Sequence, residues 1–375
     1  MILGVPKELK NHETRVGITP AGAKSLTEKG HTVLIESGAG ALSAFSDGEY
    51  QHAGAEVIGD AGTVWSRAEM VVKVKEPTPP EFGYFHKGLA LFAYLHLAPL
   101  ADLTDALVDC GVLSIAYETI TDEAGHLPLL IPMSEVAGRM AVQVGASCLQ
   151  SGYGGRGILL GGVPGVPPAS VCILGGGVVG TNAARIAHGM GAQVTIIDVN
   201  LNRLRELDDL FCGQVHTLAS NSYNVRRATR AADLVIGAVL IPGLSAPKIL
   251  SRATVEKMKP GAVVVDVAID QGGCIETARP TTHSDPTYSV NGVVHYCVSN
   301  MPAAVPNTST LALTNATLPY IVKLAQQGTW GAIASDRRIR SGVNTCHGKL
   351  TCEAIAISQN RTWRTVEESL AIAAS

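Results

Sequence analysis

The sequence predicts an α/β protein with two doubly wound parallel domains, one of them inserted into the other. Short apolar runs alternate with helix-period segments over the first 120 residues, and a second alternating series extends from residue 171 to residue 299. A glycine-rich turn joins a strand to a helix at the start of the second series. Strands that alternate with helices pair in parallel, because each helix returns the chain across the sheet.

Five apolar runs predict the strands of the first domain: Met1–Pro6, Thr32–Ser37, Met70–Lys75, Leu89–Leu95 and Val112–Glu118. A helix is expected between the first two runs, with Thr19 as N-cap, Pro20 in the first turn and Gly30 just past its end. A second helix is expected from Leu100 to Cys110, where Gly111 follows.

Six further runs predict the strands of the second domain: Val171–Leu174, Val194–Asp198, Gln214–Leu218, Asp233–Val239, Ala262–Ala268 and Val293–Ser299. Two helical stretches separate the halves, and they cover Ser134–Ser151 and Thr308–Gln327, with Pro319 as an expected kink. We therefore expect one domain from residues 1–133 plus 302–375 and an inserted domain from residues 134–301.

The composition excludes several classes of protein. Apolar residues make up 46% and charged residues 16% of the 375 residues, and the net charge is −3. A chain of this kind is packed rather than disordered, and it has no basic surface for nucleic acid. It contains no run of 18 apolar residues and no signal-like start. None of the eight cysteines forms a C-x-x-C pair, so we expect reduced thiols, a cytoplasmic location and no membrane partner.

The strongest motif is the turn GGGVVG after the strand at Val171. Gly175, Gly177 and Gly180 occupy the G-x-G-x-x-G positions, and Asp198 ends the next strand, 18 residues beyond Gly180. The first glycine permits a tight turn, the second lets the backbone approach a pyrophosphate, and the third allows helix and strand to pack closely. This combination predicts a dinucleotide site on the helix N-terminus.

Asp198 favours NAD as the cofactor. A carboxylate accepts hydrogen bonds from the ribose hydroxyls and repels the 2′-phosphate of NADP. Arg203 argues in the other direction, since a nearby arginine can hold that phosphate, although it is equally well explained as a surface helix residue.

Ligands of open α/β sheets bind beyond the carboxyl ends of the strands. Arg15, Lys75 and His96 follow strands of the first domain, and Asp270 and Asn300 follow strands of the second. We therefore expect two cations, a histidine, a carboxylate and an amide to face one cleft between the domains.

The residues alone leave alternatives open at several of these positions. Lys73 and Lys75 share one face of a strand, and spacing does not choose between them. His96 is also explained as a buried histidine, and either Asp266 or Asp270 could cap a turn. No zinc-type Cys/His spacing, H-E-x-x-H, P-loop or G-x-S-x-G motif is present, so no metal is expected.

Many segments resemble the alanine dehydrogenase family in order along the chain: GVPKELKNHETRVGITP, VVKVKEP, YLHLA, PMSEVAGRMAVQ, GGRGILLGGVPGV, ILGGGVVGTNAARIA, IGAVLIPGLSAPKI, VVVDVAIDQGGCIET and VSNMPAAVPNTSTLALTNATLPY. The resemblance extends from residue 1 to about 330, and weakly to about 360. It implies two Rossmann-like domains, a homohexamer, and reversible conversion of L-alanine, water and NAD into pyruvate, ammonium and NADH.

The resemblance also implies roles for individual residues. Arg15 and Lys75 match the holders of the substrate carboxylate, with Asn300 beside them; His96 matches the acid/base and Asp270 the second catalytic residue. The positions that match cofactor contacts are Ser134, Gly175, Gly177, Val178, Gly180, Asp198, Arg203, Ser220, Val239, Leu240, Val267, Asp270, Arg279, Val298, Asn300 and Met301. Some members hold magnesium through a glutamate and a histidine, where this chain has Lys323 and Gln327.

Three rival interpretations remain at this point. The NAD-binding component of a transhydrogenase is similar in fold, but its histidine and aspartate at the positions of His96 and Asp270 are typically replaced. A saccharopine dehydrogenase and a non-catalytic NAD sensor are the others. The sequence gives the segment after Trp330 no role beyond covering the first domain.

Overall fold

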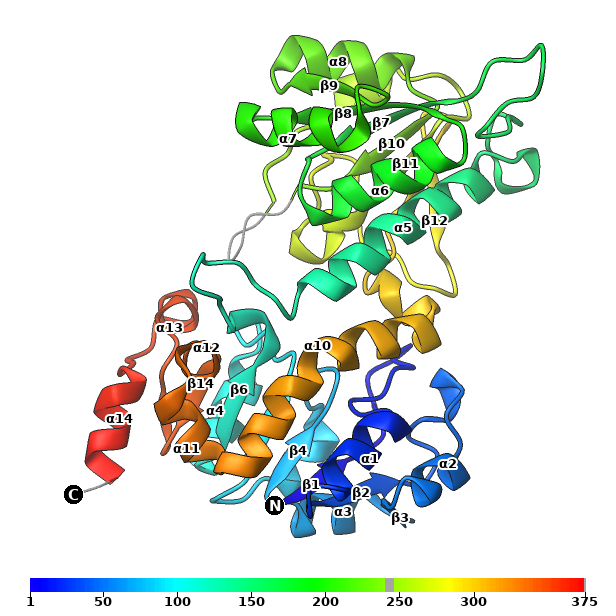
Figure 1. Cartoon of the computed structure of the whole chain (residues 1–375). Helices are drawn as coiled ribbons and strands as arrows, with labels where there is room; N and C mark the ends of the chain where they lie inside the picture. Colours follow the sequence, from blue (N-terminus) through cyan, green and yellow to red (C-terminus); the bar gives the residue numbers. More distant parts are fainter. Residues whose placement is uncertain (240–245, 374–375) are drawn as a thin grey trace. The chain divides into compact units, whose positions relative to one another are not determined.

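A computed structural model describes residues 1–239 and 246–373, and these residues form two compact units (Figure 1). The first unit contains Met1–Met133 and Ala303–Ser375, and the second contains Ser134–Pro302. Pro302 thus lies in the second unit, whereas the sequence assigned it to the first. The boundary after Met133 falls within helix α5 (Ile131–Cys148), which begins three residues before the predicted start at Ser134.

The sheet of the first unit has the strand order β15-β14-β6-β5-β4-β1-β2-β3. Six of its strands are parallel, and β14 and β15 join the edge antiparallel. Its strands are β1 (Ile2–Val5), β2 (Thr32–Glu36), β3 (Glu56–Ile58), β4 (Met70–Val72), β5 (Ala90–Ala93), β6 (Leu113–Ala116), β14 (Val343–Cys346) and β15 (Lys349–Leu350).

Helices cover the sheet of the first unit. The Thr19 hydroxyl accepts the N–H of Gly22 and caps α1, as predicted. One buried apolar cluster joins α3, α4 and α13 to β5. The helices are α1 (Pro20–Thr27), α2 (Asp47–His52), α3 (Ala61–Arg67), α4 (Ala101–Asp109), α10 (Pro306–Gln327), α11 (Thr329–Ser335), α12 (Arg337–Ser341), α13 (Glu353–Gln359) and α14 (Val366–Ala373), with the short 3-10 turns η1 (Ala41–Ser43), η2 (Pro79–Tyr84) and η3 (Tyr117–Thr119).

The second unit has a seven-stranded sheet in the order β12-β13-β11-β10-β7-β8-β9. Six strands are parallel, and β12, which the sequence analysis missed, pairs antiparallel with β13 at the edge. The strands are β7 (Ser170–Leu174), β8 (Gln193–Asp198), β9 (His216–Ala219), β10 (Leu234–Gly237), β11 (Val263–Asp266), β12 (Thr287–Val290) and β13 (Val293–Tyr296).

Helices lie on both faces of this sheet. Gly180 of α6 packs near Ile173, whereas the neighbouring strand residues Cys172 and Leu174 face a core shared with α8 and α9. Successive strand residues point to opposite faces, so α6 and α8 lie on opposite sides. The helices are α5, α6 (Val178–Gly189), α7 (Leu201–Phe211), α8 (Ser222–Ala231) and α9 (Arg252–Val255), with η4 (Ser151–Tyr153), η5 (Val267–Gln271) and η6 (Met301–Ala304).

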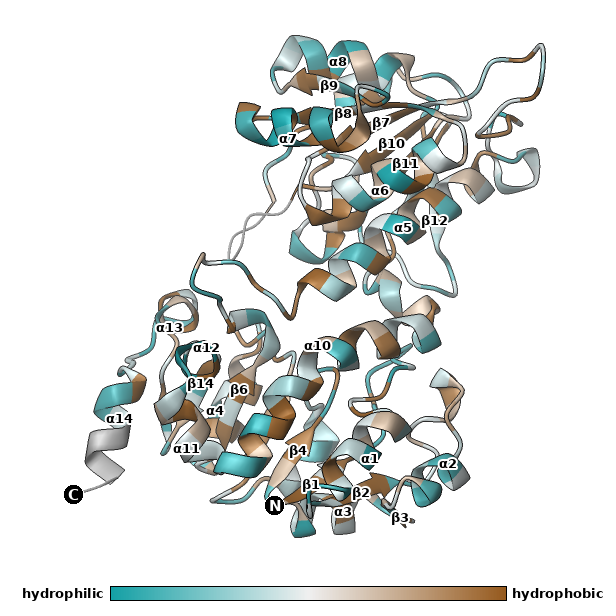
Figure 2. Cartoon of the chain, viewed as in Figure 1, coloured by the Kyte–Doolittle hydropathy of each residue, from teal (hydrophilic) through white to brown (hydrophobic). Residues whose placement is uncertain are grey.

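The doubly wound parallel fold predicted from the sequence is therefore confirmed in both units. Figure 2 shows strands of both sheets in the hydrophobic colour, whereas α7 and α8 are largely hydrophilic. None of the described helices is long and apolar enough to cross a membrane. All eight cysteines lie among the described residues, and none forms a disulfide.

Candidate functional site

The glycine turn between β7 and α6 has the geometry that the motif requires. Gly175 adopts φ +103°, a conformation that other residues rarely reach. A Cβ built on Gly180 would lie 1.9 Å from the carbonyl oxygen of Gly175, so only glycine lets α6 begin this close to the turn. Gly177 precedes Val178, the exposed first residue of α6, and no side chain caps this end of the helix.

A Cβ built on Gly177, in contrast, meets no atom of the described residues within 4 Å. Contacts with residues 1–239 and 246–373 therefore do not require glycine at this position, and its backbone borders open space beside the helix N-terminus. Backbone N–H groups and the helix dipole favour an anion at such a place. The residues present fit a dinucleotide pyrophosphate.

Asp198, at the end of β8, is tied to the glycine turn. Its carboxylate accepts the N–H of Gly176 at 2.6 Å and the N–H of Asn200 at 2.8 Å. Arg203, one turn into α7, braces the same turn: its Nε donates to the Gly176 carbonyl at 2.7 Å. Its other nitrogens bond the Thr181 hydroxyl and the carboxylate of Glu206. These contacts give Arg203 a structural role in the turn.

The remaining predicted cofactor contacts occupy varied places in the second unit. Ser220 follows β9, and its N–H donates to the carbonyl of Asp198 at 2.9 Å. The guanidinium of Arg279 lies 4.2 Å from the ring centre of Tyr288. Ser134 lies in α5, Val239 follows β10, Val267 begins η5, and Val298 and Met301 are buried after β13. Leu240 lies outside the described residues.

In the second unit, Asp266 at the end of β11 and Asp270 in the following turn η5 have different surroundings. Asp266 is fully buried, and its carboxylate accepts the N–H groups of Ala268 and Ile275. Burial raises the pKa of Asp266 to about 6. Asp270, in η5, is exposed, and its Oδ2 accepts the N–H of Asn300 at 3.3 Å. Asp266 is thus the turn cap, and Asp270 and Asn300 are brought together at the ends of neighbouring strands.

In the first unit, Arg15 is held by a carboxylate. Only 2% of the residue is exposed, and its Nε donates to Glu13 Oε1 at 2.7 Å while one terminal nitrogen pairs with Oε2 at 2.5 Å. The other terminal nitrogen contacts the sulfur of Met133 at 3.0 Å. Glu13 therefore fixes the orientation of the guanidinium and balances its charge.

Lys73 and Lys75 differ in environment. Lys73 is buried, and its Nζ lies 3.1 Å from Glu8 and 2.9 Å from Glu81, so it belongs to an internal charge network. Lys75 is half-buried, and its Nζ lies over the ring of Tyr94, 6.0 Å from the ring centre. The predicted strand Met70–Lys75 contained both lysines, but the observed strand β4 ends at Val72, so both lie just beyond it.

His96 follows β5 and adopts φ +45°, in the left-handed region. Its ring stacks on Tyr94 with centres 5.8 Å apart and planes 6° apart. Loss of hydration among protein atoms lowers the pKa of His96, and the positive charges of Lys75, Lys10 and Arg15 lower it further. Solvent reaches 44% of the side chain, so the ring is open to a ligand on one side. The imidazole is neutral near pH 7 and can accept a proton.

Tyr94 brings these predicted residues together, and sequence reasoning missed it. Tyr94 is buried, its ring stacks on His96, and Nζ of Lys75 lies over the ring, 6.0 Å from its centre. Burial raises the pKa of the Tyr94 hydroxyl, and the positive charge of Arg15 lowers it by a smaller amount. The hydroxyl donates to the Leu129 carbonyl at 2.5 Å. The YLHLA motif after β5 offered a signal, since it places Tyr94 two residues before His96. Glu13, Met133 and Glu118 were also missed, because their contacts join distant segments or local loops.

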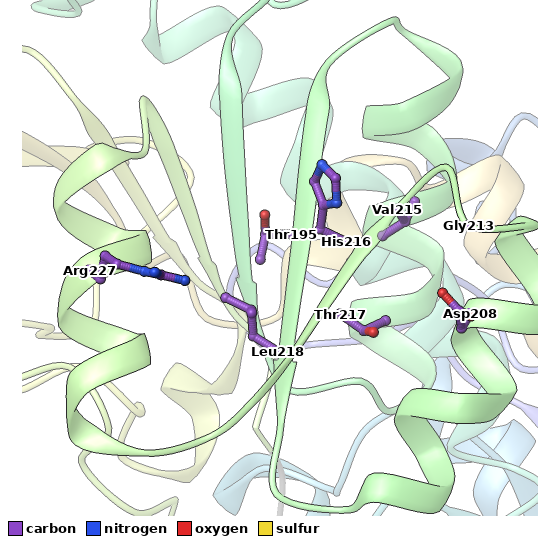
Figure 3. A pocket seen from close by; sticks show the side chains of 8 residues that line it. All are labelled: Thr195, Asp208, Gly213, Val215, His216, Thr217, Leu218 and Arg227. Atoms are coloured by element: carbon purple, nitrogen blue, oxygen red, sulfur yellow. The ribbon is translucent and has the colours of Figure 1, made fainter.

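Two pockets of the second unit lie away from these residues. One is lined by Thr195, Asp208, Gly213, Val215, His216, Thr217, Leu218 and Arg227, around β8 and β9 (Figure 3). The other is lined mainly by residues of α5 and of the segment before β7. Neither contains a predicted site residue. No group of three or more His, Cys, Asp or Glu side chains suited to a metal occurs among the residues that the structure describes.

Comparison with known proteins gives a consistent result. Residues 4–137 match the N-terminal domain, and residues 141–353 the C-terminal domain, of the family described as alanine dehydrogenase/PNT. Alanine dehydrogenase of Mycolicibacterium smegmatis is 56% identical over 356 residues, which are 95% of this chain and 96% of the relative. That of Bacillus subtilis is 57% identical over 357 residues, 95% of this chain and 94% of the relative.

Solved structures agree with these relatives. One L-alanine dehydrogenase superposes with a TM-score of 0.94 at 53% identity, over 96% of this chain and 99% of that one. A transhydrogenase from Sinorhizobium meliloti superposes with a TM-score of 0.82 at 24% identity, over 94% of this chain and 100% of that one. The second likeness concerns the fold alone.

Proposed function

The chain belongs to the alanine dehydrogenase/PNT family, and we propose that it catalyses the reversible NAD-dependent oxidative deamination of L-alanine to pyruvate and ammonium. The observation that supports this most directly is the meeting of Arg15, Lys75 and His96 around Tyr94. Two cations suit a substrate carboxylate, and a neutral histidine beside them suits proton transfer.

The second unit would hold NAD. The N-terminus of α6 and the backbone at Gly177 would bind the pyrophosphate, and Asp198 would accept the ribose hydroxyls. NAD is favoured over NADP because Asp198 would repel a 2′-phosphate and Arg203 is already bonded to the turn. When bound, the nicotinamide supplies the acceptor for the hydride that leaves the substrate.

Arg15 and Lys75 would orient the substrate through its carboxylate. Arginine offers a planar fork and lysine a mobile point charge, so together they fix direction as well as position. Since Glu13 already bonds two nitrogens of Arg15, the substrate carboxylate would share this guanidinium with Glu13. Holding Cα–H in the reacting orientation can contribute on the order of 7–11 kcal/mol to lowering the barrier.

His96 and Asp270 would manage protons and charge. Loss of hydride from the neutral amino form of the substrate leaves an iminium, and water must add to its carbon before ammonia departs. Neutral His96 would take one proton of that water and pass it to the amino nitrogen, and the remaining hydroxyl proton would be released as the carbonyl forms and ammonia leaves. Asp270 would stabilise the positive iminium and orient the water, and Asn300, held by the same carboxylate, would stay beside it.

One assay tests the proposal. The purified protein is mixed with NADH, pyruvate and ammonium, and loss of reduced-nicotinamide absorbance is followed, with ammonium omitted as control. Oxidation of NADH only with 2-oxoglutarate and lysine would favour saccharopine chemistry instead. No oxidation with any 2-oxo acid, despite NADH binding, would leave a binding module such as the transhydrogenase component.

The role of His96 is tested separately. We expect His96→Ala to lower turnover by about 10²–10⁴-fold while the dissociation constant for NADH is retained. His126→Ala is the matched control, because this histidine of the same unit has a 70% exposed side chain. Unchanged turnover in His96→Ala would remove His96 from the mechanism.

We also propose that the enzyme works as a homohexamer in the cytoplasm. The resemblance to the family supports the hexamer, and eight cysteines without a disulfide are in keeping with a reducing compartment. Sedimentation equilibrium of the purified protein should give about six times the chain mass of 39.0 kDa. A monomer or dimer at micromolar concentration would contradict this assembly.

A further inference from the structure

The segment Leu95–Ala98, which begins two residues after the end of β5, holds its second residue in a conformation that needs support. His96 has φ +45°, which places the Cβ of an ordinary residue close to its own backbone. Such a conformation persists when the surrounding structure determines it, and it is frequent at functional sites. The bonds that this segment makes therefore decide where the His96 ring lies.

Glu118 holds this segment through its N–H groups. Its Oε1 accepts the N–H of His96 at 2.6 Å, and both carboxylate oxygens lie 3.2 Å from the N–H of Leu95. Glu118 lies in η3, just after β6, which pairs with β5 in the sheet. The same Oε1 lies 3.9 Å from Nδ1 of the His96 ring.

Gln359 holds the segment through its carbonyl groups. Its Nε2, at the end of α13, donates to the Leu97 carbonyl at 2.6 Å and lies 3.4 Å from that of Ala98. It also donates to the Thr104 hydroxyl at 3.0 Å, which anchors it against α4. Leu97 itself is 1% exposed and belongs to the same buried cluster as Ile355 of α13.

We propose that Glu118 and Gln359 form a clamp, with Glu118 on the N–H side and Gln359 on the carbonyl side, that positions His96 for proton exchange with the substrate. Both are positioning residues, since Glu118 acts through the N–H of His96 and Gln359 through the carbonyl groups of the next two residues. The proposal rests on the role proposed above for His96. It also gives the C-terminal segment a part in catalysis, because Gln359 belongs to it.

The clamp explains why two groups from distant segments converge on four residues. A carboxylate suits the N–H side, since one group accepts from two donors. An amide suits the carbonyl side, since it donates hydrogen bonds without adding a charge near His96. The charged groups that act on His96 are Lys75, Lys10, Arg15 and Glu118. A role in folding alone would not require the two groups to meet on the segment that contains the candidate acid/base.

Four variants test the clamp in the full-length protein: Glu118→Ala, Glu118→Gln, Gln359→Ala and the control Ser358→Ala. Ser358 is exposed on α13, and among the described residues its hydroxyl donates to the carbonyl of Ile355 within that helix. Measurements are kcat and KM for pyruvate, the NADH dissociation constant, the unfolding temperature, and hydrogen–deuterium exchange of the peptide spanning residues 95–98.

We expect Glu118→Ala and Gln359→Ala each to lower kcat at least tenfold, to speed exchange in residues 95–98 and to leave NADH binding unchanged. Ser358→Ala should behave as wild type. Glu118→Gln keeps an acceptor oxygen, so it should restore part of kcat, while loss of the negative charge should move the acid limb of kcat/KM for L-alanine, measured in deamination, to lower pH. If Glu118→Ala does not fold, Glu118→Gln takes its place as the test of Glu118.

Several results would overturn the clamp. The clamp is wrong if the folded Gln359→Ala and Glu118→Gln proteins both keep the wild-type kcat and the wild-type exchange rate of residues 95–98. It is also wrong if kcat falls only in proportion to the fraction of the protein that is folded. If His96→Ala is inactive while these variants are normal, the clamp fails and the proposed function stands. If His96→Ala is fully active, the role of His96 fails, and the exchange measurement alone decides whether the segment is held as described.

Discussion

Replacing the second and third glycines of the β7–α6 turn should separate two roles that the motif combines. In Gly180→Ala the new methyl group would lie 1.9 Å from the carbonyl oxygen of Gly175 and 3.2 Å from a methyl group of Ile173. Carbon and oxygen do not approach this closely, so α6 must move by about 1 Å or more. In Gly177→Ala the methyl group meets no atom within 4 Å in the part of the chain that the structure describes, and φ −68° suits alanine.

The expected magnitudes follow from these contacts. Overpacking at Gly180 should cost about 1–3 kcal/mol of unfolding free energy, with a fall in the unfolding temperature. Gly177→Ala should cost only a few tenths to 1 kcal/mol, because alanine is a poorer N-cap than glycine. Its methyl group would instead occupy the space proposed for the pyrophosphate, and NADH binding should weaken at least tenfold, or about 1.4 kcal/mol.

Calorimetry without ligand and titration with NADH measure the two effects independently. Gly189→Ala, at the end of α6, is the matched control: its Cβ also meets no atom within 4 Å, and it should change neither property adversely. If Gly177→Ala bound NADH like the wild type, the pyrophosphate would not lie at this turn. If Gly180→Ala unfolded at the wild-type temperature, the close contact would not be a constraint.

Three further predictions concern charged residues. Lys73→Met should lower the unfolding free energy by about 3–5 kcal/mol in denaturant titrations, because two buried carboxylates lose their partner. Lys75→Met should instead raise KM for pyruvate, with little change in the unfolding free energy. Burial and positive neighbours lower the pKa of His96 in the free protein, and the carboxylate of a bound substrate offsets those charges. In deamination, the acid limb of the kcat profile should therefore lie at higher pH than the acid limb of the kcat/KM profile. Acid limbs at the same pH would contradict this. Isothermal titration should show tighter binding of NADH than of NADPH. Asp198→Ala should weaken NADH binding and reduce the difference between the NADH and NADPH dissociation constants.

The fold was predictable where strands are buried and apolar. Each of the eleven predicted runs overlaps a strand, because most of these strands are buried and read as continuous hydrophobic stretches. The missed strands β3, β12, β14 and β15 are short, and the last three pair antiparallel at sheet edges. β12 contains half-exposed residues, and β14 gains its place through a partner more than 200 residues away, which local patterns do not reveal.

The candidate site was predictable in outline and not in its supports. Strand ends gave Arg15, Lys75, His96, Asp270 and Asn300, because topology alone places such residues at one edge of a sheet. The roles of these residues stay predictions. Spacing did not distinguish Lys73 from Lys75, since the distinction depends on carboxylates from Glu8 and Glu81, which come from other segments.

The two units solve one structural problem in related ways. Each six-stranded parallel array has the same order, and in each a carboxylate accepts the N–H of a left-handed residue at the end of the fifth or sixth strand. In the first unit His96 follows β5 and the carboxylate of Glu118 follows β6; in the second the carboxylate of Asp270 follows β11 and Asn300 follows β13.

The carboxylate and the left-handed residue have thus exchanged strands between the units. A left-handed residue turns its side chain away from the strand direction, and a carboxylate on the neighbouring strand is close enough to fix that turn. Neither feature is visible in a sequence, because φ is not encoded by a residue type such as histidine, and the pairing joins segments 22 and 30 residues apart. The same hydrogen bond occurs in both units, each time at residues proposed to act on the substrate, and this recurrence is what a positioning role predicts.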